Sequence, residues 1–269
     1  MPKSHSHGPL IKILMYAVSD IEGHKSVTHH LLRKFIKLIR LTSSHPLYRR
    51  GLSCGVAAAI EHEDAIRSIE LGTLIDVGAN IGQFSLLARA LHPNASIYAF
   101  EPLPAAAVRF ERLFAQDRAI YLYRLAAGEI PGMASIHVSG HPDSSSLLPI
   151  TDLQNKLFPG TAQTSVLNIH VNRIDDVLKD IALLKPIMIK LDVQGFELSA
   201  LKGMPKLLQA AQHVYAEVSF KELYEGQPLA HEIVAWLAAA GFRFAGVYNT
   251  TAAADGSTIQ ADILFTKVS

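Results

Sequence analysis

The sequence predicts an α/β fold in which a mostly parallel sheet is covered by helices on both faces. From about residue 70 to the end, short apolar runs alternate with segments of helical periodicity. Repeated units of this kind form parallel sheets with right-handed crossovers. The 269 residues are 49% apolar, with 17 Gly and 13 Pro, which is enough apolar material for the core of one large α/β domain. Ligands of such sheets bind outside the carboxyl ends of the strands.

Each strand is predicted from a short, largely apolar run, and each helix from apolar residues three or four positions apart. The first run, TLIDV, ends at a glycine, and QFSLLARAL after it has helical spacing. The expected strands are residues 73–77, 96–100, 120–125, 187–193, 213–220, 242–248 and 261–267. The expected helices are residues 83–91, 103–116, a segment from about 196, and 229–240. Residues 128–164 interrupt this alternation with Pro, Gly and Ser, so we expect an inserted loop over the binding site.

Charge separates the chain into two regions. The total of 25 basic and 24 acidic residues, +1, argues against a dedicated nucleic-acid binder. Residues 1–53 hold nine basic and two acidic residues, +7, which leaves 16 basic and 22 acidic residues, −6, in the remainder. We therefore expect a basic helical extension over residues 1–54 and the main domain over residues 55–269.

The extension is predicted to contain an amphipathic basic helix over residues 27–41. Apolar residues recur there at i, i+4, i+7 and i+8, with basic side chains mostly opposite them. Such a helix either docks its apolar side on the main domain or contacts anionic lipid head groups or an acidic partner. Both interpretations stay open at this point.

The sequence gives no indication of secretion, a membrane span or a metal centre. The apolar run at residues 13–18 is too short to cross a bilayer, and no cleavage site follows it. Cys54 is the single cysteine, so neither an intramolecular disulfide nor a thiolate zinc cluster is expected. We expect a cytoplasmic protein and assign no metal ligands, while the sequence leaves open whether a divalent metal is needed.

The strongest local signal is the segment LIDVGANIGQFSLLA. An apolar strand leads to Asp76, then to a turn with Gly78, Asn80 and Gly82, and then to a helix. Asn80 occupies the middle position of the turn, so the fit to the G-x-G-x-x-G fingerprint of nicotinamide cofactors is poor. The segment resembles motif I of the S-adenosylmethionine-dependent methyltransferases instead. An acid such as Asp76 suits a ligand with an ammonium group better than a pyrophosphate.

A second acid follows the next predicted strand. Glu101, in YAFEP, lies 23 residues after Gly78 by their numbers, 101 − 78. An acidic side chain at this position accepts the hydroxyl protons of a ribose. Together with the glycine turn, Glu101 predicts a cofactor that contains adenosine.

Three further blocks resemble the FkbM family of methyltransferases. They are MIKLDVQGFELSALKG at 188–203, VYAEVSFKELYEGQP at 214–228 and ADILF at 261–265. The resemblance covers about residues 69–267. It implies the Rossmann-like class I methyltransferase fold, with a seven-stranded sheet whose last strand is antiparallel. It also implies methyl transfer from S-adenosylmethionine to an oxygen, often a hydroxyl of a sugar, a glycan or a secondary metabolite.

The catalytic candidates are charged residues on two predicted strands. Asp192 ends the fourth strand and can orient or deprotonate an acceptor hydroxyl, although a cofactor-side or structural role stays open. Glu217, at the end of the fifth strand, is the next acid within reach. Lys190 shares a strand face with Asp192 and either pairs with it or is a solvated or sheet-covering lysine. Two carboxylates are too few to predict a metal site.

Further polar residues are weaker candidates for the active site. Glu197 falls in the first turn of the helix that follows Asp192, where it can complement the helix dipole. Tyr224 and the serines at 144–146 belong to predicted loops above the sheet and offer hydroxyls to a polyol acceptor.

Three rival functions remain. One keeps the cofactor and methylates nitrogen or carbon, but the Asn-Pro-Pro-Tyr signature of such enzymes does not occur. Another is a non-catalytic adaptor that binds a partner or a membrane surface through the basic helix, yet the turn glycines and both cofactor acids are present. The third is a dehydrogenase, which binding of a reduced nicotinamide cofactor would reveal.

Overall fold

The computed structural model describes residues 37 and 39–268. Its contacts divide the chain into two units, Met1–His45 and Pro46–Ser269. Within the first unit, Lys37 and residues 39–43 are helical. The rest of the basic helix predicted over residues 27–41 lies outside the described residues. In the part of the chain that is described, no helix is long and apolar enough to cross a membrane.

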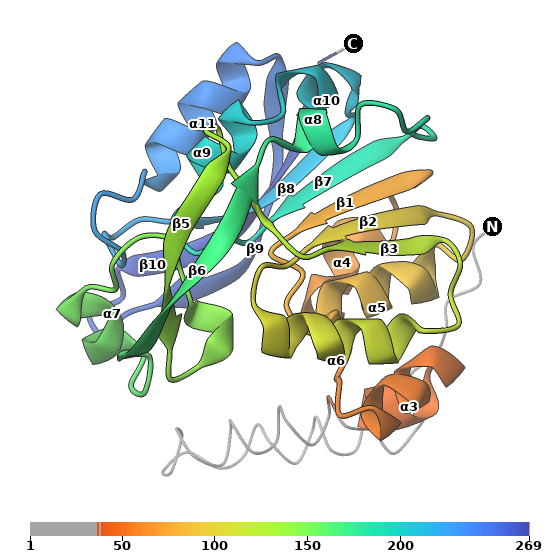
Figure 1. Ribbon diagram of the computed structural model, residues 1–269, viewed down its shortest axis with the longest axis horizontal. Coiled ribbons are helices and arrows are strands. Elements are labelled where there is room, and N and C mark those ends of the chain that lie inside the picture. Colours follow the sequence, from red (N-terminus) through yellow and green to blue (C-terminus); the bar gives the residue numbers. More distant parts are fainter. Residues whose placement is uncertain (1–36, 38, 269) are drawn as a thin grey trace. The chain divides into compact units, whose positions relative to one another are not determined.

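The second unit is built around a twisted sheet that, among the described residues, has seven strands in the order β3-β2-β1-β7-β8-β10-β9 (Figure 1). The strands are β1 Thr73–Val77, β2 Ser96–Phe100, β3 Ile120–Tyr123, β7 Ile187–Leu191, β8 His213–Ser219, β9 Phe242–Ala252 and β10 Thr258–Lys267. β1, β2, β3, β7 and β8 pair in parallel, whereas β10 is antiparallel to both of its neighbours. The predicted fold class, including the antiparallel last strand, is therefore confirmed.

Helices cover both faces of this sheet. The described helices of the second unit are α3 Pro46–Ser53, η1 Ile60–His62, α4 Glu63–Ile66, α5 Gln83–Leu91, α6 Pro104–Phe114, η2 Pro142–Ser144, α7 Asp152–Leu157, α8 Ile174–Val177, α9 Glu197–Lys202, α10 Pro205–Ala210 and α11 Ala230–Ala239. Figure 1 shows α4, α5 and α6 on one face and α9, α10 and α11 on the other. This double cover explains why the central strands are apolar runs without alternation, because both of their faces are buried.

Two charged side chains break the apolar pattern of the central strands. Asp76 in β1 and Lys190 in β7 are buried and occupy paired register positions of neighbouring strands. A buried charge is expensive unless an opposite charge accompanies it. The register of β1 against β7 therefore places the acid beside its counterion in the middle of the sheet.

A second, smaller sheet lies beside the main one, with the strand order β4-β6-β5 in the described chain. Its strands are β4 Ala126–Ala127, β5 Gly132–Ser139 and β6 Gln163–Asn172. The prediction of a continuous loop over residues 128–164 is therefore wrong for β5. Its partner β6 begins 24 residues after β5 ends, by the difference 163 − 139, so local composition does not reveal the pairing. The inward side chains of the pair, such as Ile136 and Ile169, pack against Leu103.

Candidate active site

A cavity of about 650 Å³ opens at the carboxyl ends of β1, β2 and β7. Residues that follow these three strands form one wall, and the segment at 142–147 forms part of the opposite wall together with Ile136 of β5. The inserted segment thus contributes to the predicted site even though part of it is strand.

The glycine turn between β1 and α5 forms one side of this cavity. Gly78, Asn80 and Gly82 all have a positive φ, of 82°, 47° and 94°. Gly78 and Asn80 line the cavity. Gly82 packs against α6 instead, where an added Cβ would lie 2.7 Å from the ring of Phe114. Gly82 therefore packs on the side of the turn away from the cavity, while the other two residues face the cavity.

Glu101 lies at the cavity wall and ties the turn to the end of β2. Its two carboxylate oxygens accept hydrogen bonds from the backbone amides of Asn80, at 2.9 Å, and Leu103, at 2.7 Å. Burial raises the pKa of Glu101 to about 7, although both amide hydrogen bonds act in the opposite direction. Each oxygen retains a lone pair for a further donor, so a ligand hydroxyl can still bind to this carboxylate.

Asp76, the acid expected to meet an ammonium group, is not among the residues that line the cavity. It is fully buried, and its Oδ2 accepts a hydrogen bond of 2.6 Å from the hydroxyl of Ser85 in α5. Its Oδ1 lies 3.8 Å from Nζ of Lys190. Burial raises the pKa of Asp76 despite the nearby ammonium. The structure thus locates Asp76 behind the glycine turn, where it neutralises Lys190.

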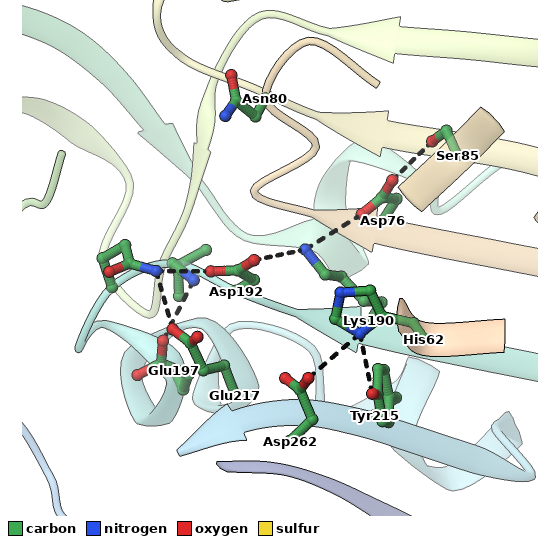
Figure 2. A network of polar contacts seen from close by, with 12 residues as sticks. His62, Asp76, Asn80, Ser85, Lys190, Asp192, Glu197, Tyr215, Glu217 and Asp262 are labelled. Carbon is green, nitrogen blue, oxygen red and sulfur yellow. Dashed lines mark hydrogen bonds and ion pairs between the residues drawn. The ribbon is translucent and has the colours of Figure 1, made fainter. Parts of the chain in front are cut away.

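Lys190 lies between Asp76 and Asp192 and contacts both, as Figure 2 shows. Its Nζ lies 3.0 Å from Oδ2 of Asp192, in addition to the contact with Asp76. Burial alone would lower the pKa of Lys190, but the carboxylates of Asp192 and Asp76 outweigh that effect and raise it. The predicted pairing of Lys190 with Asp192 is therefore present, and one ammonium serves two carboxylates.

Asp192 is the member of this network that reaches the cavity. Its side chain is 36% exposed and lines the wall, directly after β7. Its second oxygen, Oδ1, accepts a hydrogen bond of 2.7 Å from Nε2 of Gln194. Both carboxylate oxygens of Asp192 are thus held by a donor, which fixes the direction of the group.

Glu217, the other catalytic candidate, does not line the cavity. Its Oε2 accepts hydrogen bonds from Nε2 of Gln194, at 2.9 Å, and Nε2 of Gln260, at 3.1 Å. Burial and the nearby charge of Asp192 raise the pKa of Glu217 well above its usual range. Glu217 is therefore a neighbour of Asp192 that lies one layer further from the cavity.

Sequence reasoning missed two polar features near the site. Gln194 bridges Asp192 and Glu217, and only its place beside Asp192 in the KLDVQG block could have drawn attention to it. His62 lies with its Nδ1 3.0 Å from the hydroxyl of Tyr215 and 3.2 Å from Oδ2 of Asp262 (Figure 2). More than 150 residues separate His62 from Tyr215, so no local pattern predicts this cluster.

The predicted hydroxyl groups over the sheet are mostly engaged within the protein. Ser145 and Ser146 line the cavity. The hydroxyl of Ser145 accepts a hydrogen bond from the backbone of Ser139, and that of Ser146 donates one of 2.6 Å to the carbonyl of Gln194. The hydroxyl of Tyr224 lies 2.7 Å from Oε1 of Gln194. These groups fasten the segment at 142–147 over the cavity.

The charged residues that line the cavity are acidic. Of the described residues, Glu101, Asp143 and Asp192 contribute carboxyl groups to it, whereas no Lys, Arg or His does. Among the same residues, no group of three or more His, Cys, Asp or Glu side chains is arranged to hold a metal ion. A cofactor with cationic groups and a ribose fits this lining, with apolar walls such as Leu103 and Ile136 for a heterocycle.

The family model described as "Methyltransferase FkbM domain" matches residues 76–244, which include the glycine turn, Glu101 and Asp192. The chain belongs to the FkbM methyltransferase family. This FkbM-family protein is thus an S-adenosylmethionine-dependent methyltransferase, as the resemblance implied.

Curated relatives of this FkbM-family protein include three methyltransferases. "2-O-methyltransferase NoeI" from Sinorhizobium fredii is 29% identical over 209 residues, 73% of this chain and 79% of its own. "31-O-demethyl-FK506 methyltransferase FkbM" from Streptomyces tacrolimicus is 26% identical over 53% of this chain and 65% of its own. "Hexuronic acid methyltransferase AglP" from Haloferax volcanii is 30% identical over 58% of this chain and 62% of its own. The chain thus spans less than two thirds of the length of the last two.

Solved structures with a similar chain path have low sequence identity to this protein. Aeropyrum pernix fibrillarin with natively bound S-adenosyl-L-methionine has a TM-score of 0.45 and 12% identity, over 82% of this chain and 76% of its own. Magnesium protoporphyrin IX methyltransferase from Synechocystis has a TM-score of 0.42 and 11% identity, over 92% of this chain and all of its own.

Proposed function

We propose that this methyltransferase transfers its methyl group to an oxygen, namely a hydroxyl of a sugar, a glycan or a secondary metabolite, and that Asp192 orients that hydroxyl. The observation that carries the proposal is the Asp192 carboxylate, which is held at both oxygens and directed to the cavity wall. The names of the relatives support oxygen as the acceptor atom, since two of them include "O-methyltransferase" or "O-demethyl" and one includes a hexuronic acid.

The cofactor is proposed to bind in the cavity against the glycine turn. Gly78 and Asn80 bring the main chain to the cavity surface, and Gly82 allows the turn to pack closely against Phe110 and Phe114 of α6. The free lone pairs of Glu101 accept the ribose hydroxyls. Asp76 contributes from behind the turn, through Lys190, by keeping the charge of the network balanced. When bound, S-adenosylmethionine supplies a methyl group that is already activated on a sulfonium.

Asp192 is proposed to act on the acceptor. Its carboxylate would accept a hydrogen bond from the acceptor hydroxyl and take up the hydroxyl proton as the new carbon–oxygen bond forms and the carbon–sulfur bond of the sulfonium breaks, which leaves a neutral thioether. Water would then remove the proton from Asp192. Because the methyl group needs no further activation, alignment of the hydroxyl is the main contribution left to the protein. Lys190 donates a hydrogen bond to Oδ2 of Asp192, and Gln194 joins Asp192 to Glu217 behind it.

Two measurements on the purified protein test this function. Calorimetry with S-adenosylmethionine tests cofactor binding, and mass spectrometry after incubation with methyl-labelled cofactor tests transfer. The acceptor panel contains methyl glycosides of a hexose, a deoxyhexose and a hexuronic acid, cyclohexanol as a simple secondary alcohol, and an amino sugar. We expect saturable binding and a label on oxygen in at least one hydroxyl acceptor.

The variant Asp192→Asn separates the two halves of the proposal. It preserves the shape of the side chain but removes the base, so cofactor affinity should change less than about threefold, whereas transfer should fall by about 10²–10⁴. Absence of saturable heat with the wild type would refute cofactor binding. A label confined to the nitrogen of the amino sugar would refute the oxygen acceptor.

A further inference from the structure

Gln194 occupies a sharp turn directly after β7, between Asp192 and α9. It has a φ of 53°, and Gly195 after it has a φ of 93°. Side chains at such angles are strained, and only a Cβ-free residue fits the second position, where an added Cβ would lie 3.0 Å from Cβ of Gln227. This turn directs the carboxamide of Gln194 back toward the end of the sheet rather than into solvent.

The carboxamide of Gln194 donates to two carboxylates at once. Its Nε2 lies 2.7 Å from Oδ1 of Asp192 and 2.9 Å from Oε2 of Glu217. An amide nitrogen has two protons, so both are used. Hydrogen bonds to ionised acceptors are about twice as strong as neutral ones. Gln194 is thus a neutral donor that joins the two acids.

The orientation of this carboxamide follows from its neighbours at both ends. The carboxylate oxygens of Asp192 and Glu217 require a donor, so the nitrogen of Gln194 faces them and its oxygen faces Tyr224. The hydroxyl of Tyr224 lies 2.7 Å from this oxygen and can donate its proton to it; the carbonyl oxygen of Ser144, at 3.1 Å, is the other acceptor in reach. Tyr224 is fully buried, so its position is set by packing.

The main chain of Gln194 connects the same turn to the cavity segment. Its carbonyl oxygen accepts the hydroxyl of Ser146, at 2.6 Å, and Ser146 itself lines the cavity. Gln194 therefore contacts both the acid at the cavity wall and the segment opposite it.

We propose that Gln194 is a positioning residue for methyl transfer, whose carboxamide holds the carboxylate of Asp192 toward the acceptor and keeps it in register with the segment at 142–147. The proposal rests on the function proposed for Asp192. Lys190 alone would hold one oxygen and leave the carboxylate free to rotate about its bond to Cβ. A second donor at the other oxygen stops that rotation, and misalignment of a reacting group by about 1 Å can slow a reaction 10²-fold.

Three variants separate this role from a purely structural one. Gln194→Met keeps the length of the side chain but removes all three hydrogen bonds. Gln194→Glu keeps the oxygen that faces Tyr224 and replaces the donor by an acceptor. The matched control is Gln260→Met, because Gln260 donates to the same oxygen of Glu217 and makes no hydrogen bond with Asp192. Transfer is measured with the hydroxyl acceptors of the panel described above, and cofactor binding by calorimetry.

We expect kcat to fall about 10- to 100-fold in both Gln194 variants, while the dissociation constant for S-adenosylmethionine changes less than about threefold. Gln260→Met should retain kcat within about threefold. The carboxyl introduced by Gln194→Glu would face Asp192, Glu217 and Tyr224. The other charged groups that act on this cluster are Asp262, Glu197 and Lys190. When protonated, the introduced carboxyl can donate to one of the two acids, so activity of Gln194→Glu relative to Gln194→Met should rise as the pH falls.

A readout without any acceptor completes the test. In ¹⁵N spectra, the side-chain amide protons of Gln194, assigned by their loss in Gln194→Met, should exchange at least tenfold more slowly than those of the exposed Gln163. Asp192→Asn should accelerate their exchange. The positioning role would be overturned if the amide protons of Gln194 exchanged as fast as those of Gln163. It would also be overturned if kcat were equal in Gln194→Met and Gln260→Met. Either result would leave the proposed function intact. Absence of cofactor binding or of transfer by the wild type would overturn the proposed function and this role with it.

Discussion

Gly78 lies directly against the main chain of Asp192, so the glycine turn and the acid of the neighbouring strand form one packed unit. A Cβ added at Gly78 would come within 1.8 Å of the carbonyl oxygen of Asp192. The amide of Asp192 also donates to the carbonyl of Val77, at 3.0 Å. The two sequence blocks, more than 100 positions apart, therefore fix each other's position at the cavity wall.

The first prediction concerns this contact. Gly78→Ala should push the two turns apart and abolish measurable cofactor binding, because the added methyl meets backbone that cannot rotate away. An alanine at a positive φ costs about 1–2 kcal/mol by itself. Because of the added clash, the free energy of unfolding of Gly78→Ala should fall by more than this amount. Calorimetry with S-adenosylmethionine and urea unfolding provide the two measurements.

A matched control for this substitution is Gly256→Ala. Gly256 has the same φ of 82°, but nothing lies within 4 Å of its added Cβ. The control should show the conformational penalty without the clash and bind cofactor normally. Equal behaviour of the two variants would contradict the importance of the contact with Asp192.

The second prediction is a pH dependence of cofactor binding. Burial raises the pKa of Glu101 to about 7, and only the ionised carboxylate accepts both ribose hydroxyls. The dissociation constant for S-adenosylmethionine should therefore rise about tenfold per pH unit below pH 7 and level off above it. Calorimetry at pH values between about 5.5 and 8.5 measures this dissociation constant. A dissociation constant that stays the same over that range would contradict the prediction. Glu101→Ala should weaken binding by about 1–3 kcal/mol and remove the dependence.

The third prediction concerns Lys190. Lys190→Met leaves Asp76 and Asp192 without their shared counterion, and breaking a buried pair from one side costs about 3–5 kcal/mol. Urea unfolding should show this loss, and addition of Asp76→Asn should recover part of it.

The exposed pair of Arg124 and Glu111 provides the comparison for Lys190. Arg124→Met should leave the free energy of unfolding essentially unchanged, because solvent already screens that pair. If Lys190→Met were equally harmless, the buried network would have no role in stability.

The fourth prediction concerns Glu197 at the start of α9. Its Oε1 accepts the amides of both Val193 and Gly195, and burial raises its pKa from 4.5 to about 7. Because the folded state binds this proton more tightly than the unfolded state, its stabilising contribution is full below about pH 4.5 and is lost as the pH rises through about 7. The loss amounts to about 3 kcal/mol.

Glu197→Gln keeps the accepting oxygen and removes the titration. Its free energy of unfolding, from urea titrations at pH 5 and 8, roughly, should therefore fall less with pH than that of the wild type. Glu129→Gln, at an exposed position, should follow the wild type. If the free energy of unfolding of Glu197→Gln fell with pH as much as that of the wild type, the carboxyl of Glu197 would not control the pH dependence of stability.

Local patterns were sufficient for the elements of the main sheet. The expected segments 73–77, 83–91 and 96–100 have the bounds of β1, α5 and β2. Their signals are local, because a strand buried on both faces is a short apolar run and a covering helix shows its own periodicity. β5 escaped prediction because its partner lies beyond a long connection and few of its side chains are buried.

The sequence by itself determined the fold class, the glycine turn and the acids at the strand ends, because each of these depends on residues adjacent in the chain. Only the tertiary structure decided how those acids are used. Asp76 turned inward to Lys190 because β1 and β7 pair in that register, and Asp192 was left at the cavity wall. Gln194, Glu217 and Tyr224 meet there because three separate strand ends and loops converge. Such a convergence depends on packing between distant segments, which no local pattern records.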